Sequence, residues 1–301
     1  GWEARLSRPS FAFLPKAFPQ MRADLHLHST ASDGELTPAE LVRRAADRGL
    51  TLLALTDHDS TSGVPEAQAV AQEVGVRLLP GIELSATRRG REVHILGYGF
   101  DPAHPAILAR GERARALRRD RMALMVERLH ASGMQVSMEE VEATAGSART
   151  MLGRPHLART LVSSGHVASV DEAFDRWIGD RHAAFVPTEL GTASDAIETI
   201  VQAGGLPVWA HPPTDVLREW LPAFVEMGLQ GVEALRATWA PGRRRRVAKA
   251  GRLQGLCVTG GSDWHGPTRG VRLGEFWLDE EDLWDFLERL EGLPGSSASG
   301  H

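Results

Sequence analysis

The stretch ADLHLHSTASDGELTPAEL, residues 23–41, places two histidines and an acid close together just before a helix begins. His26 and His28 are two residues apart in an apolar run, so on a strand both rings lie on the same face. Asp33 follows five residues after His28. Imidazole and carboxylate groups are the side chains that bind transition metals, so the stretch is either part of a metal site or a coincidence.

The next segment has the start and stop signals of a helix. Thr37 and Glu40 form a capping box with Pro38 in the first turn, and Gly49 ends the helix. Short apolar runs and amphipathic helices alternate beyond it, which favours a parallel sheet or barrel. Further strands are expected at TLLALTDHD, VRLLPGIELSA, REVHILGYGF, LPVWAHP, GVEAL and LCVTGGSDWHG. With the first strand they number about seven, which suits a barrel better than an open sheet.

A block of helices interrupts this alternation. From about residue 103 to residue 182 the sequence has helical segments and no strand-like run, and Ser137 with Glu140 forms a second capping box there. Such a block is best explained as an insertion into the α/β series. We expect an N-terminal extension at 1–21, a barrel formed by 22–102 and 183–290, an inserted helical cap at 103–182 and a flexible tail at 291–301.

The composition is that of an ordinary globular protein of 301 residues with a net charge of −5, which argues against wholesale electrostatic binding of nucleic acid. Cys257 is the only cysteine, so the chain has no internal disulfide, and a reducing cytoplasm is the expected location. No apolar run approaches the roughly 18 residues that a membrane span needs, and we expect no membrane association. The opening residues are interrupted by prolines and do not resemble a signal peptide.

Metal-binding side chains follow almost every predicted strand. Because the carboxyl ends of parallel strands meet at one face of a barrel, these side chains are expected to converge there. One ion takes about four to six ligands, so this number of side chains predicts two or three metals. The candidates are His26, His28 and Asp33; Asp57, His58 and Asp59; Glu83; His94; His211; and Asp263 with His265.

Each of these residues also has a purely structural explanation. A single histidine beside an apolar run is more often a satisfied core or surface residue, but histidines or acids at five separate strand ends are improbable by chance. The histidines of the helical segments and their loops, His104, His130, His166 and His182, are interpreted as structural. The RRRR run at 243–246 is interpreted as the solvated face of a helix.

The motifs DLHLHSTASDGELTPAEL, LALTDHDSTSG, GIELSA, VHILGY, GRPHLARTLV, AHP and GSDWHG resemble the PHP (polymerase and histidinol phosphatase) superfamily. The resemblance covers residues 22–275. Within the superfamily it is closest to the bacterial 3′,5′-nucleotide bisphosphate phosphatases, a branch that includes 5′-to-3′ exoribonucleases acting on short RNA.

The resemblance implies a distorted (β/α)7 barrel with three metals, commonly manganese. Zinc, iron and magnesium are the alternative metals, and two ions are the alternative to three. It implies one ion on His26, His28, Glu83 and Asp263, a second on Glu83, His94 and His211, and a third on Asp33, His58 and His265. Asp57 or Asp59 is expected to orient His58 or to take part in proton transfer. Trp264 stands where the family usually has phenylalanine and is a candidate pocket wall.

The implied activity is hydrolysis of a phosphate ester by a hydroxide that bridges the metals and attacks phosphorus in line. In GRPHLARTLV, Arg154 is expected to bind a second phosphate with His156 beside it, which favours bisphosphates or the 5′ end of a short RNA as substrates. No obligate protein partner is indicated.

Three alternatives remain open. A histidinol-phosphate phosphatase has the same type of metal site, although the helical block and GRPH argue against it. An amidohydrolase-type C–N hydrolase typically uses a carboxylated lysine, and the two lysines, Lys16 and Lys249, do not follow predicted strands. A catalytically idle PHP module that binds nucleic acid is the third, and the complete set of ligand types argues against it.

Overall fold

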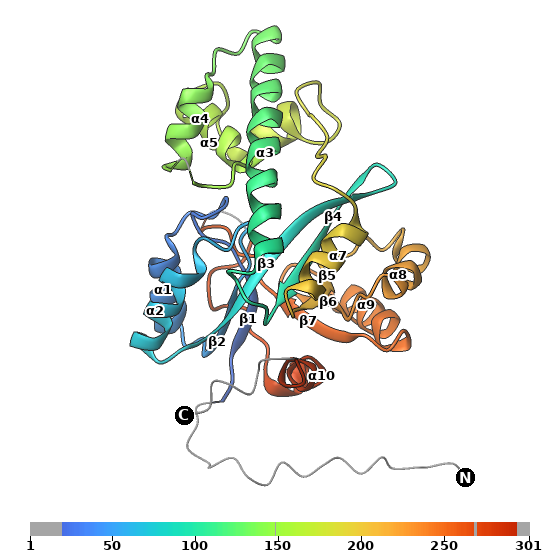
Figure 1. The fold of residues 1–301 in the computed structure, drawn as a ribbon. Helices are drawn as coiled ribbons and strands as arrows, with labels where there is room; N and C mark the ends of the chain where they lie inside the picture. The colour runs from blue at the N-terminus through green and yellow to red at the C-terminus, as the bar shows by residue number, and fades with distance from the viewer. Residues whose placement is uncertain (1–19, 148, 268–269, 294–301) are drawn as a thin grey trace, which may run out of the picture.

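The structure is a computed structural model that describes residues 20–147, 149–267 and 270–293 (Figure 1). Its strands form one sheet in the order of the chain. The strands are β1 Ala23–Leu27, β2 Leu52–Leu55, β3 Arg77–Arg88, β4 Arg91–Tyr98, β5 Leu206–Trp209, β6 Gly231–Arg236 and β7 Cys257–Gly261. The helices are α1 Pro38–Asp47, α2 Val64–Val74, α3 Pro105–Ala131, α4 Met138–Ala145, α5 Arg154–Ser163, α6 Val170–Ala173, η1 Phe174–Ile178, α7 Ala193–Gln202, α8 Leu217–Glu226, α9 Pro241–Leu253 and α10 Glu280–Glu291.

The sheet curls into a nearly closed barrel. Residues just beyond β7 pair with β1: His28 N–H donates to the carbonyl of Trp264 at 3.0 Å, and Trp264 N–H donates to the carbonyl of His26 at 3.3 Å. The prediction of a distorted barrel is confirmed. The seven expected strands are all present, as are the helix of Thr37 and that of Ser137, each with its capping box.

The expectation of a parallel sheet is wrong at β3 and β4. These strands form an antiparallel hairpin with no helix between them, and β4 is antiparallel to β5 as well. The turn consists of Arg89 and Gly90, whose φ angles are 48° and 75°. Two successive left-handed residues match the right-handed twist of the flanking strands, so the chain reverses in two residues and has no length for a crossover helix.

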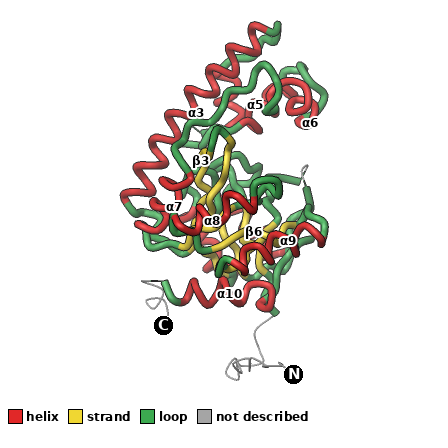
Figure 2. Tube along the Cα trace, turned by 90° about the vertical axis from the view of Figure 1, so that its right-hand side faces the viewer, coloured by secondary structure: helices red, strands yellow, loops and turns green. Residues whose placement is uncertain are grey.

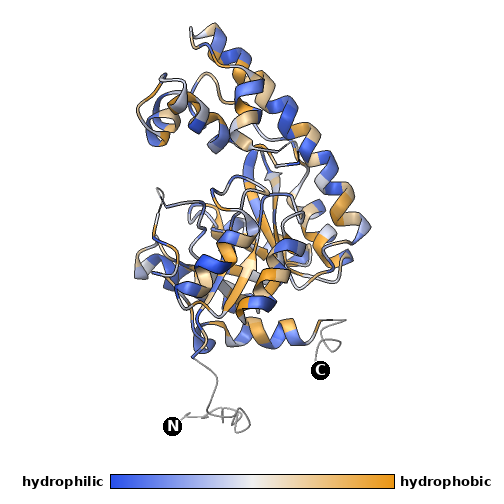
Figure 3. Ribbon diagram, turned by 90° about the vertical axis from the view of Figure 1, so that its left-hand side faces the viewer, coloured by the Kyte–Doolittle hydropathy of each residue, from blue (hydrophilic) through white to orange (hydrophobic). Residues whose placement is uncertain are grey.

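Helices cover the barrel on its outer face and at one end. In Figure 3 strands coloured as hydrophobic lie inside the lower body, and the helices around it have stretches coloured as hydrophilic. Helix α10, which the sequence did not predict, lies across the end of the barrel away from the helices α3–α6 (Figure 1). Its Leu283 and Phe286 are fully buried in one apolar cluster with Leu25, Tyr98 and Leu206, and they close that end of the core.

Helices α3 to η1, which we call the helical block, lie together above the barrel (Figures 1 and 2). They have their own apolar cluster, which includes Met125, Leu129, Leu157 and Leu161. Among the described residues no strand occurs between Tyr98 and Leu206. These features agree with an inserted unit, but the domain boundaries stay a prediction.

Two predicted segments lie almost wholly outside the described residues. Only Gln20 and Met21 of the N-terminal extension and only residues 291–293 of the tail are described. No described helix combines the length and the apolar character needed to cross a membrane.

Candidate metal centre

Glu83 of β3 lies at the centre of the predicted ligands, and its side chain is 1 % exposed. Its two carboxylate oxygens face two different sets of imidazoles. Oε1 is 2.9 Å from His94 Nδ1 and 2.9 Å from His211 Nε2. Oε2 is 3.1, 3.2 and 3.3 Å from ring nitrogens of His26, His28 and His58. A carboxylate in this position has the geometry to bridge two cations.

Three groups of side chains have their ligand atoms within 4.8 Å of one another. The group with His26 corresponds to the set predicted for one ion. The group with Asp33 adds His28 to the set predicted for another ion. In the group with His94, His58 takes the place expected for His211, although His211 Nε2 is only 3.3 Å from His94 Nδ1. The groups are His26, His28, Glu83 and Asp263; His28, Asp33, His58 and His265; and His58, Glu83 and His94. All nine predicted ligands thus come together, and their roles as ligands stay a prediction.

Several buried polar atoms at the centre have no hydrogen-bond partner among the described residues: both ring nitrogens of His28, Nδ1 of His58 and Oδ1 of Asp33. Carboxylate oxygens lie close to some of them, for example Asp263 Oδ1 at 3.2 Å from His28 Nε2, but not in hydrogen-bonding geometry. Because an unsatisfied buried polar atom is costly, atoms that converge without pairing fit a shared cation. The donor set of imidazoles and carboxylates suits manganese, iron or zinc.

The antiparallel course of β4 explains the position of His94. The ends of the parallel strands carry their polar residues to the mouth of the barrel, whereas β4 runs the other way and presents its first half there. His94 pairs in register with Ser85, two residues beyond Glu83 on β3. The sequence prediction of convergence is therefore correct for His94, although a strand end is not the reason.

Left-handed backbone occurs at three residues other than glycine around the centre. The φ angles are 49° at Asp59, 30° at His211 and 56° at Asp263. Such conformations are unfavourable for residues with a Cβ and persist where the surroundings impose them, commonly at functional sites. At Asp263 the turn directs Asp263 and His265 into the mouth and Trp264 into the core.

Buried charges dominate the electrostatics of the centre. Burial raises the pKa of Glu83, but the adjacent histidines, His58 first, outweigh burial and hold this pKa well below its usual range. Burial lowers the pKa of His58 to about 3, so its ring is neutral, the form that binds metal. For His94, burial is outweighed by Glu83 and Glu92, which raise its pKa to about 10. The ionised carboxylates attract cations, whether protons or metals.

Sequence reasoning missed the carboxylates that surround the predicted ligands. Glu233 of β6 accepts a hydrogen bond from His26 Nδ1 at 2.7 Å, which turns His26 Nε2 toward Glu83. Asp24 accepts hydrogen bonds from the Ser262 hydroxyl at 2.6 Å and the Ser262 N–H at 2.9 Å, and so fixes the chain just before Asp263. An acid between apolar residues of a predicted strand was the available signal for both, since burying a charge requires a partner.

Arg236, at the end of β6, was also missed. It donates to Asp263 Oδ2 at 2.8 Å and to Glu233 Oε2 at 3.0 Å. These contacts leave Asp263 Oδ1 to face the histidines at 3.3 and 3.2 Å from His26 and His28. Such outer hydrogen bonds orient the side chains that contact a metal.

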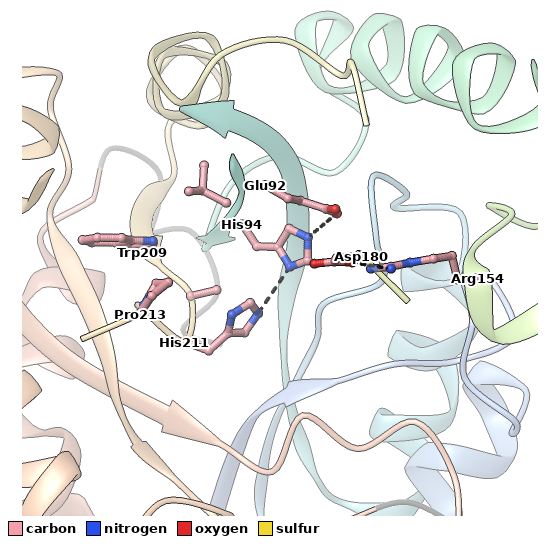
Figure 4. A pocket seen from close by; sticks show the side chains of 9 residues that line it. Glu92, His94, Arg154, Asp180, Trp209, His211 and Pro213 are labelled. Atoms are coloured by element: carbon pink, nitrogen blue, oxygen red, sulfur yellow. Dashed lines mark hydrogen bonds and ion pairs between the residues drawn. The ribbon is translucent and has the colours of Figure 1, made fainter. Parts of the chain in front are cut away.

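A cavity of about 190 Å³ opens beside His94 and His211 (Figure 4). Glu92 lies next to His94 and accepts a hydrogen bond from its Nε2 at 3.0 Å, which leaves Nδ1 facing Glu83. Arg154, the first residue of α5, lines the other side and forms an ion pair with Asp180 at 2.5 Å. The cavity therefore lies between the predicted ligands and a guanidinium of the helical block.

The two acids expected to orient His58 or to take part in proton transfer, Asp57 and Asp59, make their hydrogen bonds to other groups than the His58 ring. The Asp57 carboxylate accepts hydrogen bonds from the Ser29 N–H, the Ser29 hydroxyl and the Ser32 hydroxyl at 2.7, 2.7 and 2.6 Å. The Asp59 carboxylate binds the guanidinium of Arg118 and the Ser85 N–H. Both acids are fully engaged in holding loops, so neither hydrogen-bonds to His58.

Two of the three residues predicted to contact substrate, His156 and Trp264, are buried and do not line the cavity. His156 is 2 % exposed and its Nδ1 accepts the Gly153 N–H at 3.0 Å, so it caps its own helix. Trp264 is 3 % exposed and packs in the apolar cluster of Leu27 and Leu41, so it is a core residue and not a pocket wall. Only Arg154 lines the cavity as expected.

The structural interpretation of His104, His130 and His166 agrees with their contacts. His104 caps α3 by accepting the Ala106 N–H at 3.2 Å, and His166 Nε2 donates to the Gln135 carbonyl at 2.7 Å. His130 donates to the carbonyl of Val136. The RRRR run lies in α9, where Arg245 and Arg246 are exposed.

Comparison with known proteins yields relatives over most of the chain. The family described as PHP domain matches residues 24–131. A 5′-3′ exoribonuclease from Haemophilus influenzae is 37 % identical over 257 residues, which cover 84 % of this chain and 93 % of the relative. A 3′,5′-nucleoside bisphosphate phosphatase from Chromobacterium violaceum is 36 % identical over 254 residues, 83 % and 89 % of the two chains. A phosphoribosyl 1,2-cyclic phosphate 1,2-diphosphodiesterase from Eggerthella lenta is 35 % identical, with coverage of 82 % and 95 %.

Two solved structures share the fold. One, described as an amidohydrolase from Chromobacterium violaceum with bound sulfate and no metal, has a TM-score of 0.83 and 33 % identity, covering 92 % of this chain and 99 % of the other. The other is a candidate metal-dependent phosphoesterase from Bifidobacterium adolescentis, with a TM-score of 0.82, 33 % identity and coverage of 91 % and 96 %.

Proposed function

This chain belongs to the PHP family, and from that membership we propose that it removes a phosphate from nucleoside 3′,5′-bisphosphates and nucleotides from the 5′ end of short RNA. Hydrolysis of phosphate esters is common to the relatives at 33–37 % identity over most of their length. The names of two of them supply the two substrate classes.

We propose that the nine converging side chains hold two or three divalent cations, with manganese as the first candidate. Cations there would neutralise phosphate oxygens and lower the pKa of bound water. Glu83 would hold two of the ions apart by its two oxygens, and Glu233 would keep Nε2 of His26 pointed at them. Arg236 would hold Asp263 so that one oxygen faces the centre.

The observation that carries the choice of substrate is the position of Arg154. Its guanidinium lines the cavity that His94 and His211 line from the other side. A planar guanidinium forms paired hydrogen bonds with a phosphate, so Arg154 would bind one phosphate group while another sits over the predicted ligands. In the structure Asp180 balances the charge of Arg154, and a substrate phosphate would replace Asp180 as the partner of the guanidinium. A simple monoester lacks the second phosphate and would lose this contact.

Phosphate release with Mn²⁺ tests the proposal on four substrates: adenosine 3′,5′-bisphosphate, a short 5′-phosphorylated RNA, histidinol phosphate and a ribosyl 1,2-cyclic phosphate. We expect the first two to have the highest kcat/KM. Preference for histidinol phosphate or for the cyclic phosphate would contradict the substrate assignment while leaving phosphoesterase activity in place.

Two variants separate an enzyme from an idle binding module. Glu83→Ala removes both carboxylate oxygens at the centre and is expected to abolish turnover, whereas Glu73→Ala, at an exposed position, is expected to match the unchanged chain. Retention of activity by the Glu83 variant would contradict the proposed centre. Tight RNA binding with no turnover in any cation would favour the binding module.

Replacing Arg154 with alanine tests the second-phosphate contact. A charge-assisted bidentate contact contributes roughly 1.5–3 kcal/mol, so we expect the preference for the bisphosphate over adenosine 5′-monophosphate to fall by about 10- to 100-fold. An unchanged preference would show that Arg154 does not bind the second phosphate.

A further inference from the structure

The helical block is bonded to the barrel loops that carry predicted ligands. Met151 N–H donates to the carbonyl of Ala31 at 3.0 Å. Arg159 Nη1 donates to the carbonyl of Asp33, one of the predicted ligands, at 3.2 Å. Helix α3 runs from the top of the block down to the barrel beside β3 (Figure 1). The block is therefore attached at several points to the rim of the metal centre.

Arg118 of α3 makes the deepest of these contacts and is 6 % exposed. Its Nε and Nη2 donate to Asp59 Oδ2 at 2.9 and 2.7 Å. Nη2 also donates to the Ser85 hydroxyl at 2.8 Å, and Nη1 to the Leu152 carbonyl at 3.2 Å. All three guanidinium nitrogens are thus used, two of them on the carboxylate of a residue next to a predicted ligand.

Asp59 holds the loop of His58 against β3. Its N–H donates to the carbonyl of Glu83 at 2.9 Å, and its Oδ1 accepts the Ser85 N–H at 2.9 Å. The left-handed φ of 49° at Asp59 is unfavourable and depends on these contacts. A carboxylate buried as completely as this one also needs a partner for its charge, which Arg118 supplies.

His58 lies where two of the three groups of ligand atoms meet. Its Nδ1 is 3.3 Å from Glu83 Oε2, and its Nε2 is 4.0 Å from Asp33 Oδ2. A small rotation of the Asp59 loop would withdraw His58 from both groups. The position of this imidazole depends on a loop whose buried charge is neutralised from the helical block.

We propose that Arg118 is a positioning residue that couples the helical block to the metal centre, by holding the Asp59 loop so that His58 completes a cation site. The inference rests on the cation sites of the proposed function and does not depend on the substrate. According to this proposal, cation binding depends on the helical block even in the absence of substrate.

The test measures Mn²⁺ bound per folded chain, by equilibrium dialysis with elemental analysis, for the full chain and for Arg118→Met, Arg118→Lys and Arg119→Met. Arg119, the next residue on the same helix, is largely exposed and pairs with Glu142. We expect Arg118→Met to lose one ion, or to bind one at least about tenfold more weakly. Arg118→Lys should recover part of this binding, and Arg119→Met should match the unchanged chain.

A second variant covers the case in which Arg118→Met does not fold. Asp59→Asn combined with Arg118→Met removes both charges, so no unpaired charge stays buried, and we expect the same loss of one ion. A folded variant of either kind with unchanged Mn²⁺ number and affinity would overturn the proposal, even with a lower melting temperature. If the unsubstituted chain binds Mn²⁺ but does not hydrolyse the substrates above, that result would contradict the proposed function and leave the role of Arg118 intact.

Kinetics give an independent readout for the folded variants. A displaced cation should lower kcat, while the KM set by the cavity of Arg154 should change little. A rise in KM at constant kcat would instead place Arg118 in substrate binding and contradict the positioning role.

Discussion

At the scale of single residues, the centre depends on groups that fix the direction of each ring. His26 offers Nε2 to Glu83 because Nδ1 is bound to Glu233, and His94 offers Nδ1 because Nε2 is bound to Glu92. Residue types and spacing predicted the inner side chains. They did not distinguish acids that face the centre from acids that hold the surrounding loops, because an acid such as Asp57 has the same signature in sequence in either position.

Replacing Glu233 with glutamine tests the outer group at His26. The amide keeps the shape of the side chain but loses the charge that supports the imidazole, so Mn²⁺ affinity should fall by about 10- to 100-fold. Equilibrium dialysis measures the affinity, with Glu226→Gln on the exposed face of α8 as the matched control. Equal affinities in the two variants would show that Glu233 does not support the site.

Cys257 offers a second prediction at this scale. Burial raises the pKa of its thiol to about 12, so almost no thiolate exists at neutral pH. Alkylation by iodoacetamide at pH 8 should be slower in the folded chain than in urea by a factor on the order of 10³ or more, since only the thiolate reacts. Mass spectrometry of the two samples over time measures the rates; rapid modification of the folded chain would contradict this burial.

At the scale of elements, local signals were read well and connections less so. The capping boxes of α1 and α4 are contacts between neighbours in the chain, so the sequence contains them completely. The β3–β4 hairpin was missed because two apolar runs joined by Arg89 and Gly90 also fit separate strands of a βα series. Helix α10 has a capping box at Asp279 and Asp282 that was available in the sequence and not used.

The hairpin turn gives a prediction with an internal control. Gly90 has a φ of 75° and open space around its Cβ position, so Gly90→Ala adds strain without a clash and should destabilise the chain by about 1 kcal/mol. Gly242, in the first turn of α9, also has open space and no left-handed φ. Gly242→Ala should therefore be neutral or stabilising.

Urea unfolding followed by circular dichroism compares the two glycine variants. A loss of stability at Gly242 equal to that at Gly90 would contradict the backbone argument, because open space is common to both positions and the left-handed conformation is not.

At the scale of the whole molecule, the barrel brings together residues from His26 to His265 by closing β7 onto β1. The sequence predicted this convergence because strand ends in a barrel have a common face. It could not assign His58 between two groups of ligands or place Trp264 in the core, since both depend on the exact path of loops with left-handed backbone. The attachment of the helical block through Arg118 was equally hidden, because the contact joins residues 59 positions apart.

Cation binding should stabilise the whole molecule, because the unfolded chain has no preformed site. A cation at 100 times its Kd adds about 2.7 kcal/mol per site, which for a chain of this size raises Tm by roughly 4 °C per site. Differential scanning calorimetry with Mn²⁺ and with EDTA measures the shift. Glu83→Ala should lose most of it, and an equal Tm in both buffers would contradict a cation-binding centre.

The most direct test of the account is anomalous diffraction at the manganese edge from a crystal of the full chain grown with Mn²⁺. We predict two or three peaks of anomalous density, one of them enclosed by His26, His28, Glu83 and Asp263 and another contacting the second oxygen of Glu83. Density for these side chains in hydrogen bonds to one another, with no anomalous peak between them at saturating Mn²⁺, would contradict the central claim.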